Sequence, residues 1–211
     1  QDCHVVSMSL GGVPSRALHA AIEHAVGRNL IVLAAAGNCV KMVVWPARYK
    51  NCIALAATNI NDRPWKGSSH GRAVAVSAPG EYVWCARRKS ATDPAHDVID
   101  GGQGTSYATA NAAGVAALWL AFHNRNALID ACARKGATLQ DTFRSLLRST
   151  ARVPDPAWNA KAYGTGIIDA ERLLSTQVVP QWSSLAYEDY AYIGHLGNAL
   201  EAPVSGGLLQ L

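Results

Sequence analysis

The sequence predicts an α/β fold in which helices cover both faces of a mostly parallel sheet. Residues 4–9 form a short run, rich in apolar and β-branched residues, that stops at Leu10-Gly11-Gly12, as a strand does. A helical pattern follows, and residues 30–36 are then apolar throughout, which is typical of a strand covered on both faces. Strand, helix and strand in this order form a βαβ unit, so we expect parallel strands and a right-handed crossover.

The remaining elements are predicted in order along the chain. The helix between the first two strands begins near Pro14-Ser15, ends near Gly27 and has apolar residues three and four positions apart (Leu18, Ala21, Ile22, Ala25 and Val26). Further strands are expected at 52–58, 73–77 and about 82–85, with a polar loop over 87–102. Helices are expected over 106–122, 127–134 and 139–149, and a short one ends near Leu174. Thr138 and Asp141 form a plausible capping pair for the third of these helices.

Composition limits the classes of protein to consider. The 211 residues are 49% hydrophobic and 16% charged, which suits one large domain better than two small ones. The net charge of +4 is scattered except at residues 87–89. No basic helix or aromatic platform accompanies that triplet, so no nucleic-acid partner is expected. No apolar run is long enough to span a membrane, and no signal peptide is found, so no membrane partner is expected either.

The five cysteines argue against a metal site built from side chains. They are an odd number with no CxxC pair, and a chain with so large a core seldom needs a disulfide framework. One or two disulfides stay open. From residue 178 the composition changes to an aromatic-containing, then glycine-rich stretch. We therefore divide the chain into a domain over 1–176 and a C-terminal tail over 177–211.

Ser106 stands where a tight Gly104-Thr105 turn runs directly into an apolar helix. A serine there has its hydroxyl near free backbone N–H groups at the positive end of the helix. That is where an enzyme of acyl transfer needs its nucleophile. An ordinary helix cap explains the same residues, so the motif by itself leaves both interpretations open.

Asn38 follows the second predicted strand directly, after Gly37. In open α/β sheets, ligands bind beyond the carboxyl ends of the strands. The side-chain amide of Asn38 is therefore placed to reach a substrate. A simple turn residue is the alternative interpretation.

Three blocks in this order resemble the subtilisin-like serine proteases, or subtilases: residues 9–12 (SLGG), 35–38 (AAGN) and 104–108 (GTSYA). Trp45-Pro46, Ala78-Pro79-Gly80 and residues 163–166 agree with the same family. The resemblance implies a subtilisin-like three-layer fold, incomplete at the N-terminus. Residues 1–176 would then be the C-terminal two-thirds of a catalytic domain.

The resemblance also implies roles for individual residues. Ser106 matches the nucleophile, and Asn38 matches the side-chain donor of the oxyanion hole. Two stretches match the walls of the substrate cleft: Ser9, Leu10 and Gly11 on one side, and Ala35, Ala36 and Gly37 on the other. Val44 falls near the floor of the pocket, which predicts a preference for small or medium apolar residues. No cofactor is required, although a structural Ca²⁺ or Na⁺ on the carbonyls of Ala47, Tyr49 and Cys52 is possible.

The family pattern is broken at the catalytic base. Subtilases use a histidine and an aspartate from blocks that precede the segments found in this chain, and neither block is present. His70-Gly71 is a superficial match only. Ala110-Asn111 stands where the family has Pro-His, which is expected to loosen the start of the helix.

Three interpretations follow. The first is a serine endopeptidase whose base and aspartate lie in a missing N-terminal segment. The second is a catalytically inactive homologue that binds peptides or regulates. The third is an unrelated Rossmann-like domain. Such a domain typically has a GxGxxG turn after its first strand, and residues 10–14 do not match that pattern. The first implies a polypeptide substrate and a partner, either that segment or another protein, that covers an exposed sheet edge. The resemblance favours a secreted or extracytoplasmic protein.

Overall fold

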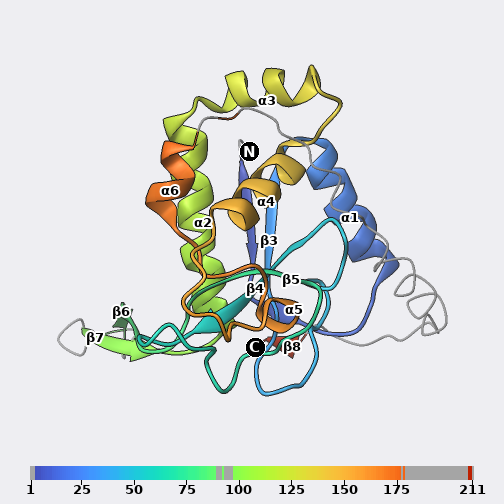
Figure 1. Ribbon diagram of the computed structural model, residues 1–211. Helices are drawn as coiled ribbons and strands as arrows, with labels where there is room; N and C mark the ends of the chain where they lie inside the picture. Colours follow the sequence, from blue (N-terminus) through green and yellow to red (C-terminus); the bar gives the residue numbers. More distant parts are fainter. Residues whose placement is uncertain (1–2, 89–91, 93–96, 177, 179–208, 211) are drawn as a thin grey trace.

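The computed structural model describes residues 3–88, 92, 97–176, 178 and 209–210. Its centre is a parallel sheet with the strand order β1-β3-β4-β5 (Figure 1). The strands are β1 (Val5–Met8), β3 (Ile31–Ala35), β4 (Ile53–Thr58) and β5 (Val74–Pro79). All three strand pairs are parallel, so the predicted βαβ unit and parallel sheet are confirmed.

Helices cover both faces of this sheet, as the sequence predicts. On one face α1 (Arg16–Gly27) packs Ile22 and Val26 with Val32 and Ala34 of β3. On the other, Ile31 and Leu33 of β3 face α2 (Thr105–Phe122). The same face carries α3 (Arg125–Ala133), α4 (Leu139–Thr150) and α6 (Ala170–Ser175). Successive side chains of a strand point to opposite faces, so one fully apolar strand supplies both cores.

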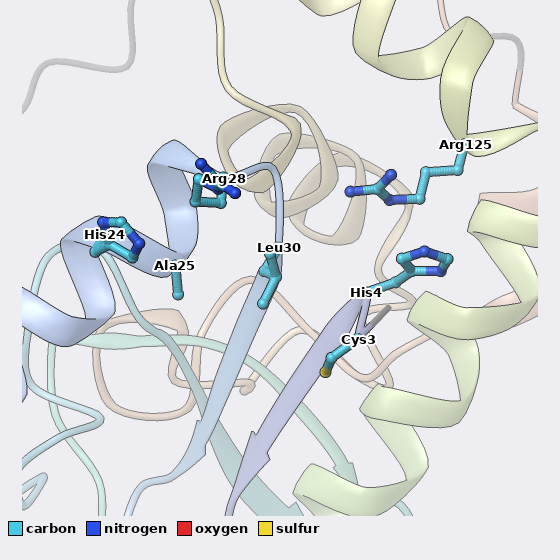
Figure 2. Close-up of a pocket in the computed structure, with 7 residues that line it drawn as sticks. All are labelled: Cys3, His4, His24, Ala25, Arg28, Leu30 and Arg125. Atoms are coloured by element: carbon cyan, nitrogen blue, oxygen red, sulfur yellow. The ribbon is translucent and has the colours of Figure 1, made fainter. Parts of the chain in front are cut away.

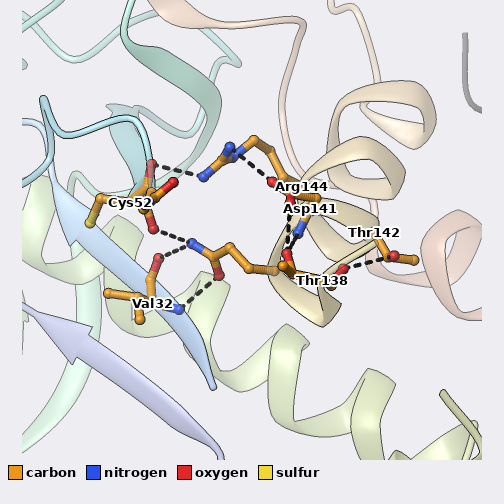
Figure 3. Close-up of polar contacts among 8 residues, drawn as sticks. Val32, Cys52, Thr138, Asp141, Thr142 and Arg144 are labelled. Carbon is orange, nitrogen blue, oxygen red and sulfur yellow. Dashed lines mark hydrogen bonds and ion pairs between the residues drawn. The ribbon is translucent and has the colours of Figure 1, made fainter. Parts of the chain in front are cut away.

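Helix boundaries follow the capping residues. The Ser15 hydroxyl accepts a hydrogen bond from the Leu18 N–H, and α1 ends at Gly27, close to the predicted bounds. The predicted pair at α4 is confirmed, since Thr138 Oγ1 accepts from the Asp141 N–H at 3.0 Å and donates to the Asp141 carboxylate at 2.7 Å (Figure 3). A short helix, α5 (Ala160–Tyr163), was not predicted.

A buried glutamine joins α4 to the sheet. The Gln140 side chain accepts from the Val32 N–H at 2.9 Å and donates to the Val32 and Asn51 carbonyls at 3.0 and 2.8 Å (the network of Figure 3). Gln140 is 1% exposed. Its amide therefore satisfies backbone groups that would be costly to bury unpaired.

The predicted polar loop over 87–102 is wrong in part. Strands β6 (Val83–Arg88) and β7 (Asp97–Gly102) form an antiparallel hairpin that projects from the body of the molecule (Figure 1). Most side chains of this hairpin are exposed or half-buried. The strand predicted at about 82–85 falls in β6 and is confirmed. β7 was not predicted, because the hairpin is held by backbone pairing rather than by an apolar face.

A second, small sheet lies outside the central one. Its two-residue strand β2 (Leu10–Gly11) pairs antiparallel with β8 (Leu209–Gln210). The aromatic residues of the predicted tail (Trp182, Tyr187, Tyr190 and Tyr192) lie outside the described residues, and the predicted division at residue 176 stays a prediction. Among the described helices, none is long and apolar enough to cross a membrane.

Candidate active site

Asn38 and the first turn of the helix that carries Ser106 lie together at the carboxyl end of the sheet. Asn38 lies three residues after the end of β3, and Ser106 is the second residue of α2. The Ser106 N–H belongs to the first turn of the helix, where backbone donors have no acceptor within the helix. A loop that ends a strand and a helix that begins therefore bring two kinds of N–H donor to one place.

Thr105 connects the two segments. Its backbone N–H and its hydroxyl both donate to Asn38 Oδ1, each at 2.9 Å. The Thr105 hydroxyl in turn accepts from the Gly37 N–H at 3.2 Å. Thr105 is fully buried. The loop after β3 is thus fixed to the first turn of α2 through a single side chain.

These contacts decide which end of the Asn38 amide is free. Because Oδ1 takes both Thr105 donors, the Nδ2 group is the end left to donate to a ligand. It lies beside Gly104, where an added Cβ would stand 3.2 Å from Nδ2. Gly104 also has φ +145°, a backbone conformation that favours glycine. The glycine therefore allows both the turn and the close approach of the amide.

The Ser106 hydroxyl has no hydrogen-bond partner within the described part of the chain, although its oxygen is buried. His70, the superficial match for a base, instead packs on Tyr163 with ring centroids 5.6 Å apart. His19 stacks on Tyr49, and His123 lies against Trp119 and Phe122. Within the described part of the chain, no histidine is hydrogen-bonded to the Ser106 hydroxyl.

Backbone hydrogen bonds join the segments predicted as cleft walls and pocket floor. The Val44 N–H donates to the Ala36 carbonyl at 3.0 Å, and the Gly12 N–H donates to the Trp45 carbonyl at 2.9 Å. Residues 44–45 thus join the end of β3 to the segment after β2. A Cβ added at Gly37 would lie 3.1 Å from a Val44 methyl, so the predicted floor residue lies close to the predicted wall. The Trp45-Pro46 bond is cis.

The proposed carbonyl ligands for a cation do not fit well. The Cys52 carbonyl accepts from the Arg144 guanidinium at 3.4 Å (Figure 3). The Tyr49 carbonyl accepts from the Cys52 N–H at 3.0 Å. A metal at Cys52 would therefore compete with a fixed positive charge. In the part of the chain that the structure describes, no cluster of three or more His, Cys, Asp or Glu could hold a metal either.

A pocket of about 380 Å³ lies elsewhere, at the amino ends of β1 and β3 (Figure 2). It is lined by His4, His24, Arg28 and Arg125, among others. Asn38 and Ser106 are at the opposite, carboxyl end of the sheet. This pocket is therefore separate from the candidate active site, and its two histidines are not near the serine.

One residue of the site was not predicted, and one prediction about the site is wrong. The sequence identifies Thr105 only as part of a turn, because its partner Asn38 is remote in the sequence. Ala110-Asn111 does not loosen the helix, since α2 is continuous from Thr105 to Phe122. The Asn111 amide donates to the Pro79 carbonyl at 2.9 Å, which fixes the helix to the end of β5 instead.

Known proteins resemble this chain in sequence and in fold. The model of the subtilase family matches residues 1–166. Thermitase from Thermoactinomyces vulgaris is 39% identical over 129 residues, which is 60% of this chain and 43% of thermitase. Subtilisin BL from Lederbergia lenta is 30% identical over 177 residues, 80% of this chain and 55% of that protein. A solved protease from Pseudoalteromonas arctica PAMC 21717 has a TM-score of 0.68 at 29% identity, over 81% of this chain and 50% of that one.

The parallel sheet between two helix layers defines a subtilisin-like fold. The chain belongs to the subtilase family. The relatives of this chain named above are proteases. It spans about half the length of the relatives it matches.

Proposed function

We propose that this chain carries the nucleophile and oxyanion hole of a subtilisin-type serine endopeptidase. The observation that carries the proposal is the contact through Thr105, which holds Asn38 against the first turn of α2 beside Ser106. An ordinary helix cap at the start of α2 would not need Asn38, which is remote in the sequence and whose amide is oriented by two hydrogen-bond donors of Thr105. Membership of the subtilase family supports the same assignment.

In the proposed reaction, Ser106 Oγ attacks the carbonyl carbon of a peptide bond and loses its proton to a base. The carbonyl oxygen becomes negative and accepts from Asn38 Nδ2 and the Ser106 N–H. The amine leaves with a proton from the base, and an acyl-enzyme remains on Ser106. Water then attacks the acyl carbon and loses its proton to the base. Ser106 Oγ leaves with that proton, which releases the acid product and restores the serine. This chemistry needs no cofactor.

The base and its aspartate are proposed to come from a segment outside these 211 residues. Two observations support this. The Ser106 hydroxyl has no partner within the described residues, and the chain spans about half the length of its relatives. The isolated chain should then be nearly inert, because an unassisted serine is a weak nucleophile at neutral pH.

Two surfaces could receive such a segment. Strand β1 is at the edge of the described sheet, and sheet edges present unpaired backbone groups. Helix α2 is apolar on more than one side, with Leu118 57% and Phe122 69% exposed. A helix apolar all round is normally buried all round. We propose that the remainder of the catalytic domain covers this face.

The substrate is proposed to be an extended polypeptide with a small or medium apolar residue before the scissile bond. The closeness of Val44 to Gly37 supports a shallow pocket, since the two Val44 methyls would lie 3.1 and 3.3 Å from a Cβ added at Gly37. One relative is an extracellular serine proteinase from a Thermus strain, 36% identical over 121 residues. We therefore propose an extracytoplasmic location.

A second candidate is an inactive homologue that binds peptides. The lack of a partner for Ser106 Oγ within the described residues favours it. Peptide turnover by the full-length protein separates the two. We expect turnover that Ser106→Ala abolishes and that Asn38→Leu lowers in kcat by roughly 10²–10³-fold, a magnitude measured on another subtilisin. Peptide binding without turnover in the unmodified protein would establish the inactive homologue instead.

A further inference from the structure

The strand edge of the proposed substrate site is already paired. β8 runs antiparallel to β2, with Leu10 opposite Gln210 and Gly11 opposite Leu209. β2 lies next to the site, since the following Gly12 N–H donates to the Trp45 carbonyl beside Val44. In Figure 1, β8 lies at the end of the molecule where the carboxyl ends of the strands meet.

An extended peptide and β8 would need the same backbone groups. Peptide binding by strand addition uses the free N–H and C=O groups of one strand edge. Each N–H donates to one acceptor in a ladder, so a second strand can pair only after the first has left. Leu10 and Gly11 are two of the three residues in the proposed wall. Their pairing with β8 therefore excludes a substrate from that wall.

We propose that the segment carrying Leu209 and Gln210 is an intramolecular competitor of the polypeptide substrate. The proposal rests on the proposed function, because it takes β2 as the substrate edge. A competitor in the same chain acts at an effective concentration set by its tether rather than by dilution. The ladder is only two residues long, and each backbone hydrogen bond contributes modestly. A longer, better-matched substrate therefore displaces it.

The pairing is between backbones, which fixes the design of the variants. Proline has no N–H and cannot donate to a ladder. Only one of two adjacent residues in an antiparallel ladder points its N–H at the partner strand. The double variant Leu209→Pro/Gln210→Pro removes the backbone N–H of both β8 residues at constant length, so the one that faces β2 is lost, and deletion of 209–211 removes the strand. The matched control is Leu209→Ala/Gln210→Ala, which changes the same side chains and keeps both donors. All are made in the full chain with Ser106→Ala, so that no variant can cleave the probe.

The first readout is amide hydrogen exchange at Leu10 and Gly11. The second is binding of a fluorescein-labelled Ala-Ala-Ala-Val peptide amide. We expect faster exchange and roughly 5- to 30-fold tighter peptide binding in the proline and deletion variants, as expected for losing one or two backbone hydrogen bonds. The alanine control should match the parent in both measurements.

Equal peptide affinity in all variants would contradict the proposal that β8 competes with the substrate. Unchanged hydrogen exchange at Leu10 and Gly11 would contradict it as well. Both results would leave the proposed function intact. If the peptide binds none of the variants, β2 is not the strand edge that binds the substrate, and the proposed competition by β8 fails with that assignment. Turnover by the full-length protein tests the catalytic assignment separately. The two proposals can therefore fail independently.

Discussion

Thr105 determines how Asn38 is presented. Its hydroxyl donates to Asn38 Oδ1 and accepts from the Gly37 N–H, while its backbone N–H holds the same oxygen. Thr105→Val keeps the shape and the backbone contact and removes only the hydroxyl. We expect kcat of the full-length enzyme to fall by about tenfold with KM little changed, less than for loss of Asn38 itself.

Thr105→Ser is the matched control, because it restores the hydroxyl. It should recover most of the lost kcat. A valine variant with full activity would show that the backbone N–H alone orients the amide. An equal loss in the serine and valine variants would assign the effect to packing rather than to the hydrogen bond.

Cys52 gives a pH dependence whose sign can be worked out. Burial raises the pKa of the Cys52 thiol from 9.0 to about 12, although Arg144 opposes the shift. Between pH 9 and 12 the unfolded chain releases this proton and the folded chain keeps it. The free energy of unfolding should therefore fall as pH rises, by up to about 1.4 kcal/mol per pH unit. Below pH 9 the contribution is constant.

Urea unfolding of the parent and Cys52→Ala at several pH values from 8 to 10.5 measures this effect. The variant should lose less stability than the parent above pH 9, whatever its stability at pH 8. Parallel pH curves would contradict the raised pKa. Cys39 is exposed, so Cys39→Ala serves as the control for removing a thiol outside the core.

At the scale of elements, Gln140 connects α4 to the sheet with three hydrogen bonds to Val32 and Asn51. Gln140→Leu is similar in size and leaves those backbone groups unpaired. We expect a loss of about 3 kcal/mol in the free energy of unfolding. Ser149→Ala, on the exposed side of the same helix, should cost less than about 0.5 kcal/mol. Urea unfolding of both checks the prediction, and a similar cost for both would contradict it.

The elements that pack into the core are the ones the sequence predicts well. The strand at Ile31–Ala35 is apolar throughout because both faces are buried, and α1 has one apolar face because it covers one side of the sheet. In the hairpin β6–β7 the sequence predicts only the first half of β6, since most side chains of the hairpin are exposed or half-buried. The same limit applies to the site. Ser106 and Asn38 stand in recognisable motifs, whereas Thr105 gains its meaning only from a contact across the fold.

At the scale of the whole molecule, the exposed face of α2 predicts self-association of the isolated chain. Leu118 and Phe122 are apolar and exposed, and contiguous apolar surface on a folded domain favours association. Leu118→Gln/Phe122→Gln should lower the apparent mass seen by light scattering without lowering the melting temperature. Val153 is 57% exposed and is not part of α2, so Val153→Gln is the control and should not change the mass. A monomeric parent would contradict the prediction.

The central claim is that Ser106 is the nucleophile of a complete enzyme to which these residues contribute. Its most direct test is covalent labelling of the full-length protein by a fluorophosphonate probe, followed by peptide mapping. We predict a single modified residue, Ser106, no labelling of Ser106→Ala, and negligible labelling of residues 1–211 alone. Labelling at another residue, or no labelling of an intact full-length protein, would contradict the assignment.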